Sequence, residues 1–471
     1  MAIDDLLAST PELVDLAERL TRAGHEVALV GGSVRDAIRQ GRPGDLDLAT
    51  SARPEQVLDT LAGWADATWD VGIAFGTVGA RRGGAEFEIT TYRSDAYDRQ
   101  TRKPEVTYGR TLEEDLLRRD FTINAMAVRL PVGIFLDPFD GLTDLATRTL
   151  RTPATPEESF ADDPLRMMRA ARFVSQLGVQ VAPEVAAAMQ QMAGRLSRVS
   201  AERVRDELSK LLLAERPREG LELMVGSGLA DVVLPELPAL RLEIDEHHRH
   251  KDVYEHSLTV LDQAIDLETS HEPAIGPDLV LRLAALLHDI GKPRTRRFEG
   301  GGRVSFHHHE VVGAKMTRRR LTALRFPRSV VEDVTELVEL HLRFHGYSGG
   351  EWTDSAVRRY VRDAGDQLVR LHKLTRADCT TRNARKAAAL RRTYDALEGR
   401  IDRLAAAEEL AAIRPDLDGN EIMAILGIGP GRDVGRAYAW LLERRLDEGP
   451  LDRQRAEAEL RAWWAATGGA G

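Results

Sequence analysis

The chain has 471 residues, of which 43% are hydrophobic and 30% are charged. This balance excludes global disorder, and the length is enough for about three domains of roughly 150 residues each. With 65 basic and 75 acidic residues the net charge is −10, which excludes a histone-like protein that binds nucleic acid through its overall charge. Any contact with nucleic acid must therefore use local arginine patches and metal ions.

The cysteine content and the apolar segments favour a cytoplasmic location. Cys379 is the single cysteine and cannot form an internal disulfide, which fits a reducing compartment. Acidic residues interrupt the apolar positions of residues 1–20, which predicts an amphipathic helix and not a signal peptide. The most apolar stretch, residues 279–287, is far shorter than the ~20 residues of a membrane span. We expect no membrane attachment, and the sequence carries no signal for an oligomeric state.

Strand patterns are confined to the first part of the chain. Runs typical of strands occur at residues 26–30, 46–49, 76–80 and 86–92. From Pro164 onward, segments rich in Leu, Ala, Arg and Glu keep helical spacing. The predicted fold class is therefore α+β, with a mixed-sheet head followed by an all-α remainder.

A glycine turn connects the first predicted strand to a helix. Gly31 and Gly32 follow residues 26–30, and a helical pattern continues to residue 40. Glycines allow the backbone to approach a ligand closely, and free N–H groups at a helix start favour anions. A glycine pair by itself is most often a plain turn, but with Arg35 nearby this segment fits a triphosphate cradle.

Two aspartates next to this turn suggest metal-dependent chemistry. In the predicted strand 44–48, alternation places Asp45 and Asp47 on one face and the intervening leucines in the core. Adjacent carboxylates repel each other unless a cation lies between them, which suits Mg²⁺ ions for phosphoryl transfer; the alternative is a solvated edge strand. Glu88 is the candidate for a third carboxylate, although Glu86 shares its face of the strand.

Together these residues resemble the nucleotidyltransferase head of the DNA polymerase β superfamily, most closely class II CCA-adding enzymes and bacterial poly(A) polymerases. Residues 118–126, 137–141 and 162–173 resemble the family's arginine motif, head-to-neck hinge and templating motif, although the family usually has Glu where this chain has Asp162. The resemblance implies Mg²⁺ at catalytic Asp45, Asp47 and Glu88. It also implies nucleotide binding by Gly31, Gly32, Ser33, Arg35, Asp36, Arg118, Arg119, Asn124, Asp163, Arg166, Arg169 and Arg172.

Two residues of the templating motif can select a base through hydrogen bonds. Asp163 and Arg166 are three residues apart, which predicts a shared helix face. Cytosine and adenine can donate an amino hydrogen to Asp163 and accept from Arg166 at the adjacent ring nitrogen. Uracil and guanine would leave the carboxylate without a donor, at a cost of about 1–3 kcal/mol or more. The alternative is a simple salt bridge within the helix.

Histidines and aspartates later in the chain suggest a second metal site. The ordered set His256, His288-Asp289 and Asp378 resembles the HD phosphohydrolase domain, and His309 and His341 match the second-metal ligands of its binuclear members. The neighbouring His307 and His308 leave the alignment at His309 open. The resemblance implies a divalent metal of unspecified identity and a phosphatase or 2′,3′-cyclic phosphodiesterase activity on RNA ends. The implied ligands are His256, His288, Asp289, Asp378, His309 and His341.

These patterns predict four domains. They are a nucleotidyltransferase head at residues 1–150, a helical neck at 151–240 that selects the nucleobase and binds RNA, an HD domain at 241–385 and a helical, tRNA-binding tail at 386–471. The leading hypothesis is a CCA tRNA nucleotidyltransferase that uses ATP and CTP. A poly(A) polymerase, a partial CC- or A-adding enzyme, and an HD phosphohydrolase with a nucleotide-binding head are the alternatives.

Two features favour full CCA addition: an HD domain, which is more usual in CCA-adding enzymes than in their polyadenylating relatives, and a polar loop. Residues 93–108 are polar and carry Arg and Lys, like the flexible loop that the family links to the switch from C to A addition, which favours full CCA addition. Arginine-rich stretches at residues 195–210, 318–320 and 382–403 are expected to include contacts to tRNA, because tRNA is recognised largely through shape and backbone.

Overall fold

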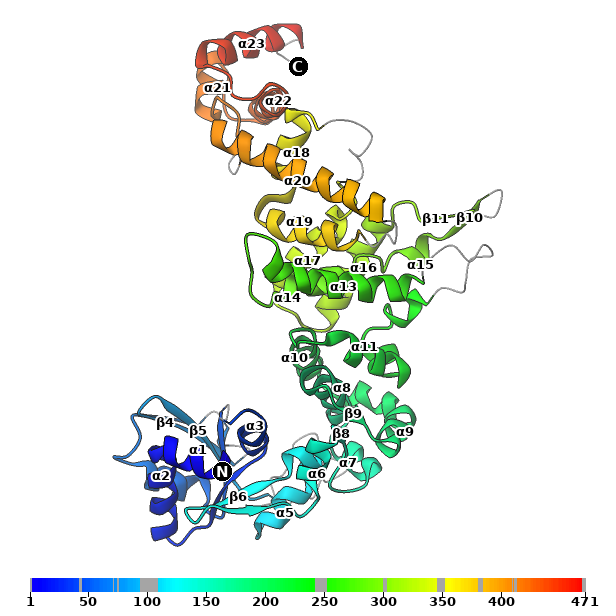
Figure 1. Cartoon of the computed structure of the whole chain (residues 1–471). Helices are drawn as coiled ribbons and strands as arrows, with labels where there is room; N and C mark the ends of the chain where they lie inside the picture. Colours follow the sequence, from blue (N-terminus) through cyan, green and yellow to red (C-terminus); the bar gives the residue numbers. More distant parts are fainter. Residues whose placement is uncertain are drawn as a thin grey trace. The chain divides into compact units, whose positions relative to one another are not determined.

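The structure is a computed structural model that describes residues 2–41, 45–70, 72–73, 76–93, 109–241, 252–299, 303–344, 352–379, 384–408, 410 and 413–467. The chain divides into two compact units, Met1–Pro235 and Glu236–Gly471. The first contains the sheet and a group of helices, and the second is helical apart from one short hairpin (Figure 1).

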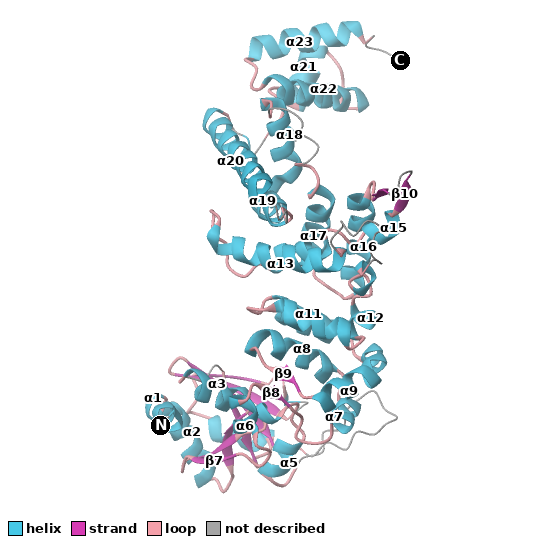
Figure 2. Ribbon diagram, turned by 45° about the vertical axis from the view of Figure 1, so that its right-hand side comes forward, coloured by secondary structure: helices cyan, strands magenta, loops and turns pink. Residues whose placement is uncertain are grey.

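A seven-stranded mixed sheet forms the centre of the first unit (magenta in Figure 2), in the order β3-β4-β5-β2-β1-β6-β7. Only β2 and β5 pair in parallel; the other neighbours are antiparallel. The predicted mixed-sheet head is confirmed, with three strands that the sequence patterns did not reveal, β3, β6 and β7. The strands are β1 (Val27–Val30), β2 (Leu46–Thr50), β3 (Ala67–Trp69), β4 (Thr77–Arg82), β5 (Ala85–Thr91), β6 (Ala127–Leu130) and β7 (Ile134–Leu136).

Alternation along the strands divides the head core into two layers. Leu29 and Leu48 pack on one face with helices α1 (Ala2–Ser9), α2 (Pro11–Arg22), α3 (Gly32–Gln40) and α4 (Pro54–Leu61). Ala28 and Ala49 pack on the opposite face with α5 (Leu112–Leu117). The single N-terminal helix that the sequence predicted is wrong in detail, because Pro11 begins a second helix after Thr10.

The helices after the sheet belong to the same unit. Helix α8 packs against α10 and α11, and Gly220 of α11 is needed for this contact because a Cβ there would lie 2.4 Å from the carbonyl oxygen of Ala171. A short parallel ladder joins β8 (Thr149–Leu150) to β9 (Gln180–Val181). The helices are α6 (Gly141–Ala146), α7 (Pro156–Asp162), α8 (Leu165–Leu177), α9 (Pro183–Met192), α10 (Ala201–Leu212), α11 (Pro217–Gly226) and α12 (Leu229–Val233).

The second unit is built around a buried helix, α14 (Leu279–Leu287), which contacts α13, α17 and α19. Its one charged residue, Arg282, is buried and forms a two-pronged ion pair with buried Glu268. None of the described helices combines the length and apolar character needed to cross a bilayer.

The predicted helical remainder is confirmed, with the hairpin β10 (Arg297–Glu299) and β11 (Arg303–Ser305) as an addition. The other helices of the second unit are α13 (Val253–Ser270), α15 (Lys292–Thr295), α16 (His309–Ala323), α17 (Arg328–Leu340), α18 (Asp354–Ala364), α19 (Leu368–Ala377), α20 (Ala384–Ala407), α21 (Gly419–Leu426), α22 (Arg432–Glu448) and α23 (Arg453–Ala466).

Candidate active site and metal centre

Three carboxylates gather on one face of the head sheet. Asp47 of β2 lies directly opposite Glu88 of the parallel strand β5, and Asp45 immediately precedes β2. The register also separates the two candidate glutamates, because Glu88 is paired with Asp47, whereas Glu86 lies before Phe87, the first β5 residue paired with β2. Asp45, Asp47 and Glu88 therefore lie close together, and their binding of metal ions stays a prediction.

The electrostatics of this cluster fit a bound cation. Burial raises the pKa of Asp47 to about 6, and the charges of Glu88 and Asp45 add to this effect, while Arg119 and Arg35 oppose it. A carboxylate that is destabilised by burial and by like charges is stabilised by a divalent ion. Carboxylate oxygens are also the ligands that Mg²⁺ prefers.

Ser33 fixes the backbone that carries the two aspartates. Its hydroxyl donates to the carbonyl oxygen of Asp45 at 2.5 Å and accepts from the backbone N–H of Asp47 at 2.8 Å. The first turn of α3 is thereby tied to the start of β2. Besides its predicted place in the nucleotide cradle, Ser33 therefore has a positioning role that sequence reasoning missed.

The glycine turn brings the cradle close to the carboxylates. Gly31 has φ +70°, and a Cβ at this position would lie 2.6 Å from Nη1 of Arg119. A Cβ at Gly32 would lie 3.5 Å from Nη2 of Arg35 and 4.0 Å from Oδ2 of Asp47. The two glycines thus leave space between two arginines and the carboxylate of Asp47, and any larger residue at Gly31 would fill it.

A hydrogen-bond chain connects the cradle to helix α8. Arg35 is bound to neighbouring Asp36 and donates to Oδ1 of Asn124 at 2.6 Å, and Asn124 donates to Oδ1 of Asp120 at 3.0 Å. Oδ2 of Asp120 accepts two bonds from Arg169 of α8, at 2.8 and 2.6 Å. Asp120 was not among the predicted site residues, although it lies between the predicted Arg119 and Asn124.

The ion pair between Asp120 and Arg169 predicts a pH-dependent contribution to the free energy of unfolding. Burial acts to raise the pKa of Asp120, but the charge of Arg169 and the hydrogen bond from Asn124 outweigh it and lower that pKa from 3.8 to about 2. Asp120→Asn is expected to lower the free energy of unfolding at pH 7 by about 2 kcal/mol. Because the folded-state pKa is depressed, the difference from wild type should be complete above pH ~4 and shrink as the pH falls towards ~2.

Denaturant unfolding of both proteins between pH 7 and pH 3 measures this difference. Asp206→Asn is the control, since Asp206 is exposed and forms its ion pair with its neighbour Arg205 at the surface. A loss of stability in Asp120→Asn that is the same at pH 3 as at pH 7 would contradict the ionic role of Asp120.

The six predicted residues of the second site also converge. His256 lies in α13, His288 and Asp289 follow α14, His309 begins α16, and His341 and Asp378 follow α17 and α19. Their ligand atoms form two groups within which all atoms lie within 4.8 Å of one another. The groups are His256, His288 and Asp378, and Asp289, His309 and His341.

Asp289 joins the two groups. Its Oδ2 lies 3.2 Å from Nε2 of His288 and 3.5 Å from Nε2 of His256, whereas its Oδ1 lies 3.2 Å from Nε2 of His309. Each carboxylate oxygen therefore faces a different group, which is the geometry of a bridging ligand.

Backbone carbonyls orient three of the imidazoles. Nδ1 of His288, His309 and His341 lies 2.8, 2.8 and 2.7 Å from the carbonyl oxygens of residues 285, 306 and 338. Such a contact fixes the ring and leaves Nε2 available as a metal ligand. All three rings thus present Nε2 to the centre.

The environment of His341 shows that the residues fit metal ions. Its Nε2 is buried and has no hydrogen-bond partner in the described part of the chain. Burial, followed by the charge of His288, lowers the pKa of His341 to about 3, so the imidazole is neutral near pH 7. A buried neutral imidazole without a partner suits a divalent first-row metal.

Three comparisons with known proteins bear on these sites. Residues 27–151 match the poly A polymerase head domain, residues 178–240 the probable RNA and SrmB-binding site of polymerase A, and residues 253–383 the HD domain. The A-adding tRNA nucleotidyltransferase of Deinococcus radiodurans is 36% identical over 454 residues, which cover 94% of this chain and 96% of the relative. The chain belongs to the tRNA nucleotidyltransferase family.

Other members of the family extend this result. The CCA-adding enzyme of Streptococcus gordonii is 40% identical over 247 residues, which cover 52% of this chain and 60% of that enzyme. The Bacillus stearothermophilus CCA-adding enzyme in complex with CTP has a TM-score of 0.70 and 26% identity, covering 97% of this chain and 98% of that chain. The resemblance on which the sequence analysis relied is confirmed, and the chain is a nucleotidyltransferase.

In this tRNA nucleotidyltransferase Asp163 and Arg166 do not share a helix face, and that prediction is wrong. Asp163 ends α7 in an extended conformation, with φ −139° and ψ 99°, and α8 begins at Leu165. The residue before a proline disfavours the α region, so Pro164 separates the two helices. Arg166 donates to Oγ of Ser159 at 2.9 Å and to the carbonyl oxygen of Arg118 at 2.5 Å.

The remaining predicted nucleotide-binding arginines already have acidic partners. Arg118 and Arg119 lie 3.6 and 2.9 Å from Asp115, and buried Arg172 lies 2.6 Å from buried Glu207. Contacts from these arginines to a nucleotide stay a prediction. The sequence patterns did not point to Asp115 or Glu207. Asp115 lies outside the matched motifs, and Glu207 lies in a helix whose charged residues are typical of a solvent-exposed face.

Several histidines lie outside the HD centre, and one lysine lies inside it. His307 and His308 have side chains that are 72% and 83% exposed, which resolves the open alignment in favour of His309. Residues 247, 248 and 250 lie outside the described part of the chain. Nζ of Lys292 lies 2.6 Å from Oδ2 of Asp289, a contact at spacing i,i+3 that sequence reasoning missed.

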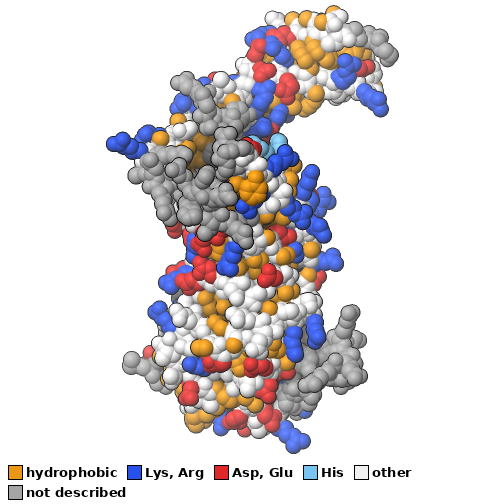
Figure 3. Space-filling view, turned by 90° about the vertical axis from the view of Figure 1, so that its right-hand side faces the viewer, with side chains coloured by type: hydrophobic (Ala, Val, Ile, Leu, Met, Phe, Trp, Pro, Cys, Tyr) orange, Lys and Arg blue, Asp and Glu red, His pale blue; other side chains and the backbone are white. Residues whose placement is uncertain are grey.

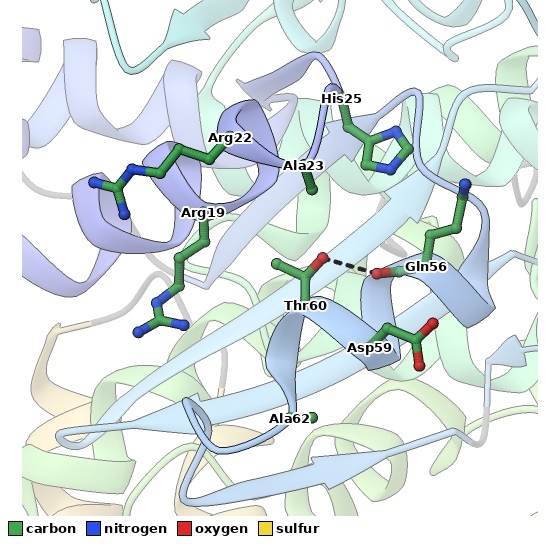
Figure 4. A pocket seen from close by; sticks show the side chains of 8 residues that line it. All are labelled: Arg19, Arg22, Ala23, His25, Gln56, Asp59, Thr60 and Ala62. Carbon is green, nitrogen blue, oxygen red and sulfur yellow. Dashed lines mark hydrogen bonds between the residues drawn. The ribbon is translucent and has the colours of Figure 1, made fainter.

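A hollow elsewhere on the head is separate from the cluster of Asp45, Asp47 and Glu88. It has a volume of about 570 Å³ and is lined by residues of α2, α4 and the segments that follow them (Figure 4). Its lining contains Asp59 but none of the three clustered carboxylates.

On the face drawn in Figure 3, basic and acidic side chains are interspersed, consistent with the surface ion pairs. The predicted tRNA contacts of the arginine-rich stretches therefore stay predictions.

Proposed function

We propose that this tRNA nucleotidyltransferase adds C, C and A to the 3′ end of tRNA from CTP and ATP, without a nucleic-acid template. The observation that carries the proposal is the cluster of Asp45, Asp47 and Glu88 beside the glycine turn, in a chain whose structure matches that of a CCA-adding enzyme along its length. The proposed substrates and the single Cys379 fit the cytoplasm.

The proposed reaction is an in-line displacement. The 3′ hydroxyl of the tRNA attacks the α-phosphorus of the nucleotide, a new phosphodiester bond forms, and pyrophosphate leaves. Asp45, Asp47 and Glu88 would hold Mg²⁺, which would neutralise charge and activate the attacking hydroxyl. Arg35 and Arg119 border the same space and offer positive charge to the triphosphate, while Ser33 keeps the two aspartates in register.

The experiment that tests the proposal uses three tRNA substrates. Transcripts that end at the discriminator base, at C or at CC are incubated with CTP, ATP, UTP or GTP, and the products are sequenced. Full activity predicts C addition to the first two substrates and A addition to the third. Runs of A on every substrate would instead identify a poly(A) polymerase.

An enzyme that adds only the terminal A is the second candidate. The full-length match to the A-adding enzyme of Deinococcus radiodurans favours it, whereas the matches to CCA-adding enzymes such as that of Streptococcus gordonii span about 60% of those relatives. Of the loop at residues 93–108, which favours full CCA addition, all but Arg93 lies outside the described residues. Extension of the CC-ending transcript alone, and with ATP alone, would identify this activity.

Base selection is expected to depend on Asp163. Asp163→Ala removes the acceptor for the amino group of cytosine or adenine and should relax discrimination against UTP and GTP by about 10-fold or more. Competition assays with paired nucleotides measure this ratio, and filter binding measures the affinity for tRNA, which should change less. An unchanged nucleotide preference would show that Asp163 has a structural role and does not read the base.

We also propose that the HD centre binds two divalent metal ions and hydrolyses phosphate esters, including 2′,3′-cyclic phosphates at RNA ends. The bridging position of Asp289 and the unpartnered Nε2 of His341 support the two ions. Lys292 beside Asp289 supplies a positive charge that suits a phosphate group.

A further inference from the structure

The carboxylate of Asp163 is held by a residue of another helix. Its Oδ1 accepts from the backbone N–H of Leu165 at 3.1 Å, and its Oδ2 accepts from Nη2 of Arg203 in α10 at 2.7 Å. Each oxygen thus has one donor and keeps a second lone pair. The two donors together fix the plane of the carboxylate.

The position of Arg203 is set by the packing of α10 against α8. Glu207 lies one turn after Arg203, is buried, and accepts from Nε of Arg172 at 2.6 Å. The same glutamate lies 3.5 Å from Nη1 of Arg169. Ser200 caps the start of α10 by accepting from the backbone N–H of Arg203. The buried ion pairs therefore lock the register of α10, and Arg203 reaches Asp163 as a consequence.

We propose that Arg203 is a positioning residue for nucleotide selection, a role that rests on the proposed function of Asp163. An oriented carboxylate can only accept, so it favours bases with an amino group and disfavours the carbonyl groups of uracil and guanine. Without Arg203 the carboxylate loses one of its two anchors and can turn away from the base. Discrimination then falls, although the carboxylates that perform the chemistry are untouched.

Single-turnover incorporation with Arg203→Ala, Arg203→Lys and Arg203→Gln tests the proposal. We expect Arg203→Ala to lower the preference for CTP over UTP, and for ATP over GTP, by about 10-fold, with a smaller change in the rate with the correct nucleotide. Arg203→Lys keeps one charged donor and should restore part of the preference. Arg218→Ala is the control, because Arg218 pairs with Glu222 on the neighbouring helix α11 and should leave the ratios unchanged.

A double-variant cycle separates positioning from other roles. Asp163→Ala with Arg203→Ala should show no greater loss of selectivity than Asp163→Ala alone, because Arg203 acts through Asp163. Additive losses would overturn the proposal, and so would an unchanged nucleotide ratio with weaker tRNA binding. A lower KM with unchanged ratios would also overturn it, by showing that Arg203 competes with the base.

The outcome for Asp163 alone distinguishes this inference from the proposed function. If Asp163→Ala leaves the ratios unchanged, the base-reading role itself fails. If Asp163→Ala relaxes them and Arg203→Ala does not, only the role of Arg203 fails. Thermal unfolding of each variant establishes that the neck is folded before selectivity is compared.

Discussion

Asp47→Ala is expected to abolish nucleotide addition, with a loss of about a thousandfold or more in the rate, or about 4 kcal/mol of barrier. Burial and two neighbouring acids destabilise the charged form of the Asp47 carboxylate, so a divalent ion bound there is expected to have a large effect. Asp45→Ala should have a similar effect, because the two side chains share the cluster. Binding of tRNA should persist, since it depends on remote contacts.

Single-turnover extension of a CC-ending transcript measures this loss, and filter binding measures tRNA affinity. Glu86→Gln is the matched control: Glu86 is exposed, lies two residues from Glu88 on the same strand, and faces Arg81 in the register. Glu88→Gln should impair addition while Glu86→Gln should not. Residual activity of Asp47→Ala within about tenfold of wild type would contradict a catalytic role for Asp47.

Removing Asp289 together with His288 is expected to abolish metal binding at the HD centre. The double variant His288→Ala with Asp289→Ala takes one ligand from the first group and the residue that joins both groups. Bound metal and hydrolysis of 2′,3′-cyclic nucleotides should both be lost, because a site of three protein ligands does not retain its ion with two. Nucleotide addition should persist, because Asp45, Asp47 and Glu88 belong to a different unit of the chain.

Metal content by elemental analysis and hydrolysis of a 2′,3′-cyclic mononucleotide provide the two readouts. His307→Ala with His308→Ala is the control, since both histidines are exposed and adjoin the ligand His309. His288 and Asp289 are buried, so circular dichroism must first show a native melt; His309→Gln, at the edge of the second group, is the alternative variant if the melt fails. Unchanged metal content in a folded variant would show that these residues are not ligands, and loss of nucleotide addition would show that the sites are coupled.

Much of the head site follows from local patterns. Alternation along a strand determines that Asp45 and Asp47 share a face, because successive side chains of a strand point in opposite directions. The glycine turn before α3 is equally local, since the positive φ of Gly31 is a property of that residue. The ordered HD residues were also recognisable, because their identities and sequence order suffice for the resemblance.

The tertiary structure decided which distant residues meet. Glu88 and not Glu86 faces Asp47 because the parallel register of β2 and β5 fixes the pairing of segments about forty residues apart. Asp163 does not share a helix face with Arg166, because Pro164 disfavours helical backbone at Asp163. The packing of α10 instead brings Arg203 to its carboxylate. The link between Asp120 and Arg169 joins residues 49 positions apart, whose proximity depends on the fold. Side-chain periodicity is set by the geometry of one element, whereas these contacts depend on how separate elements pack, which a single sequence does not encode in any local pattern.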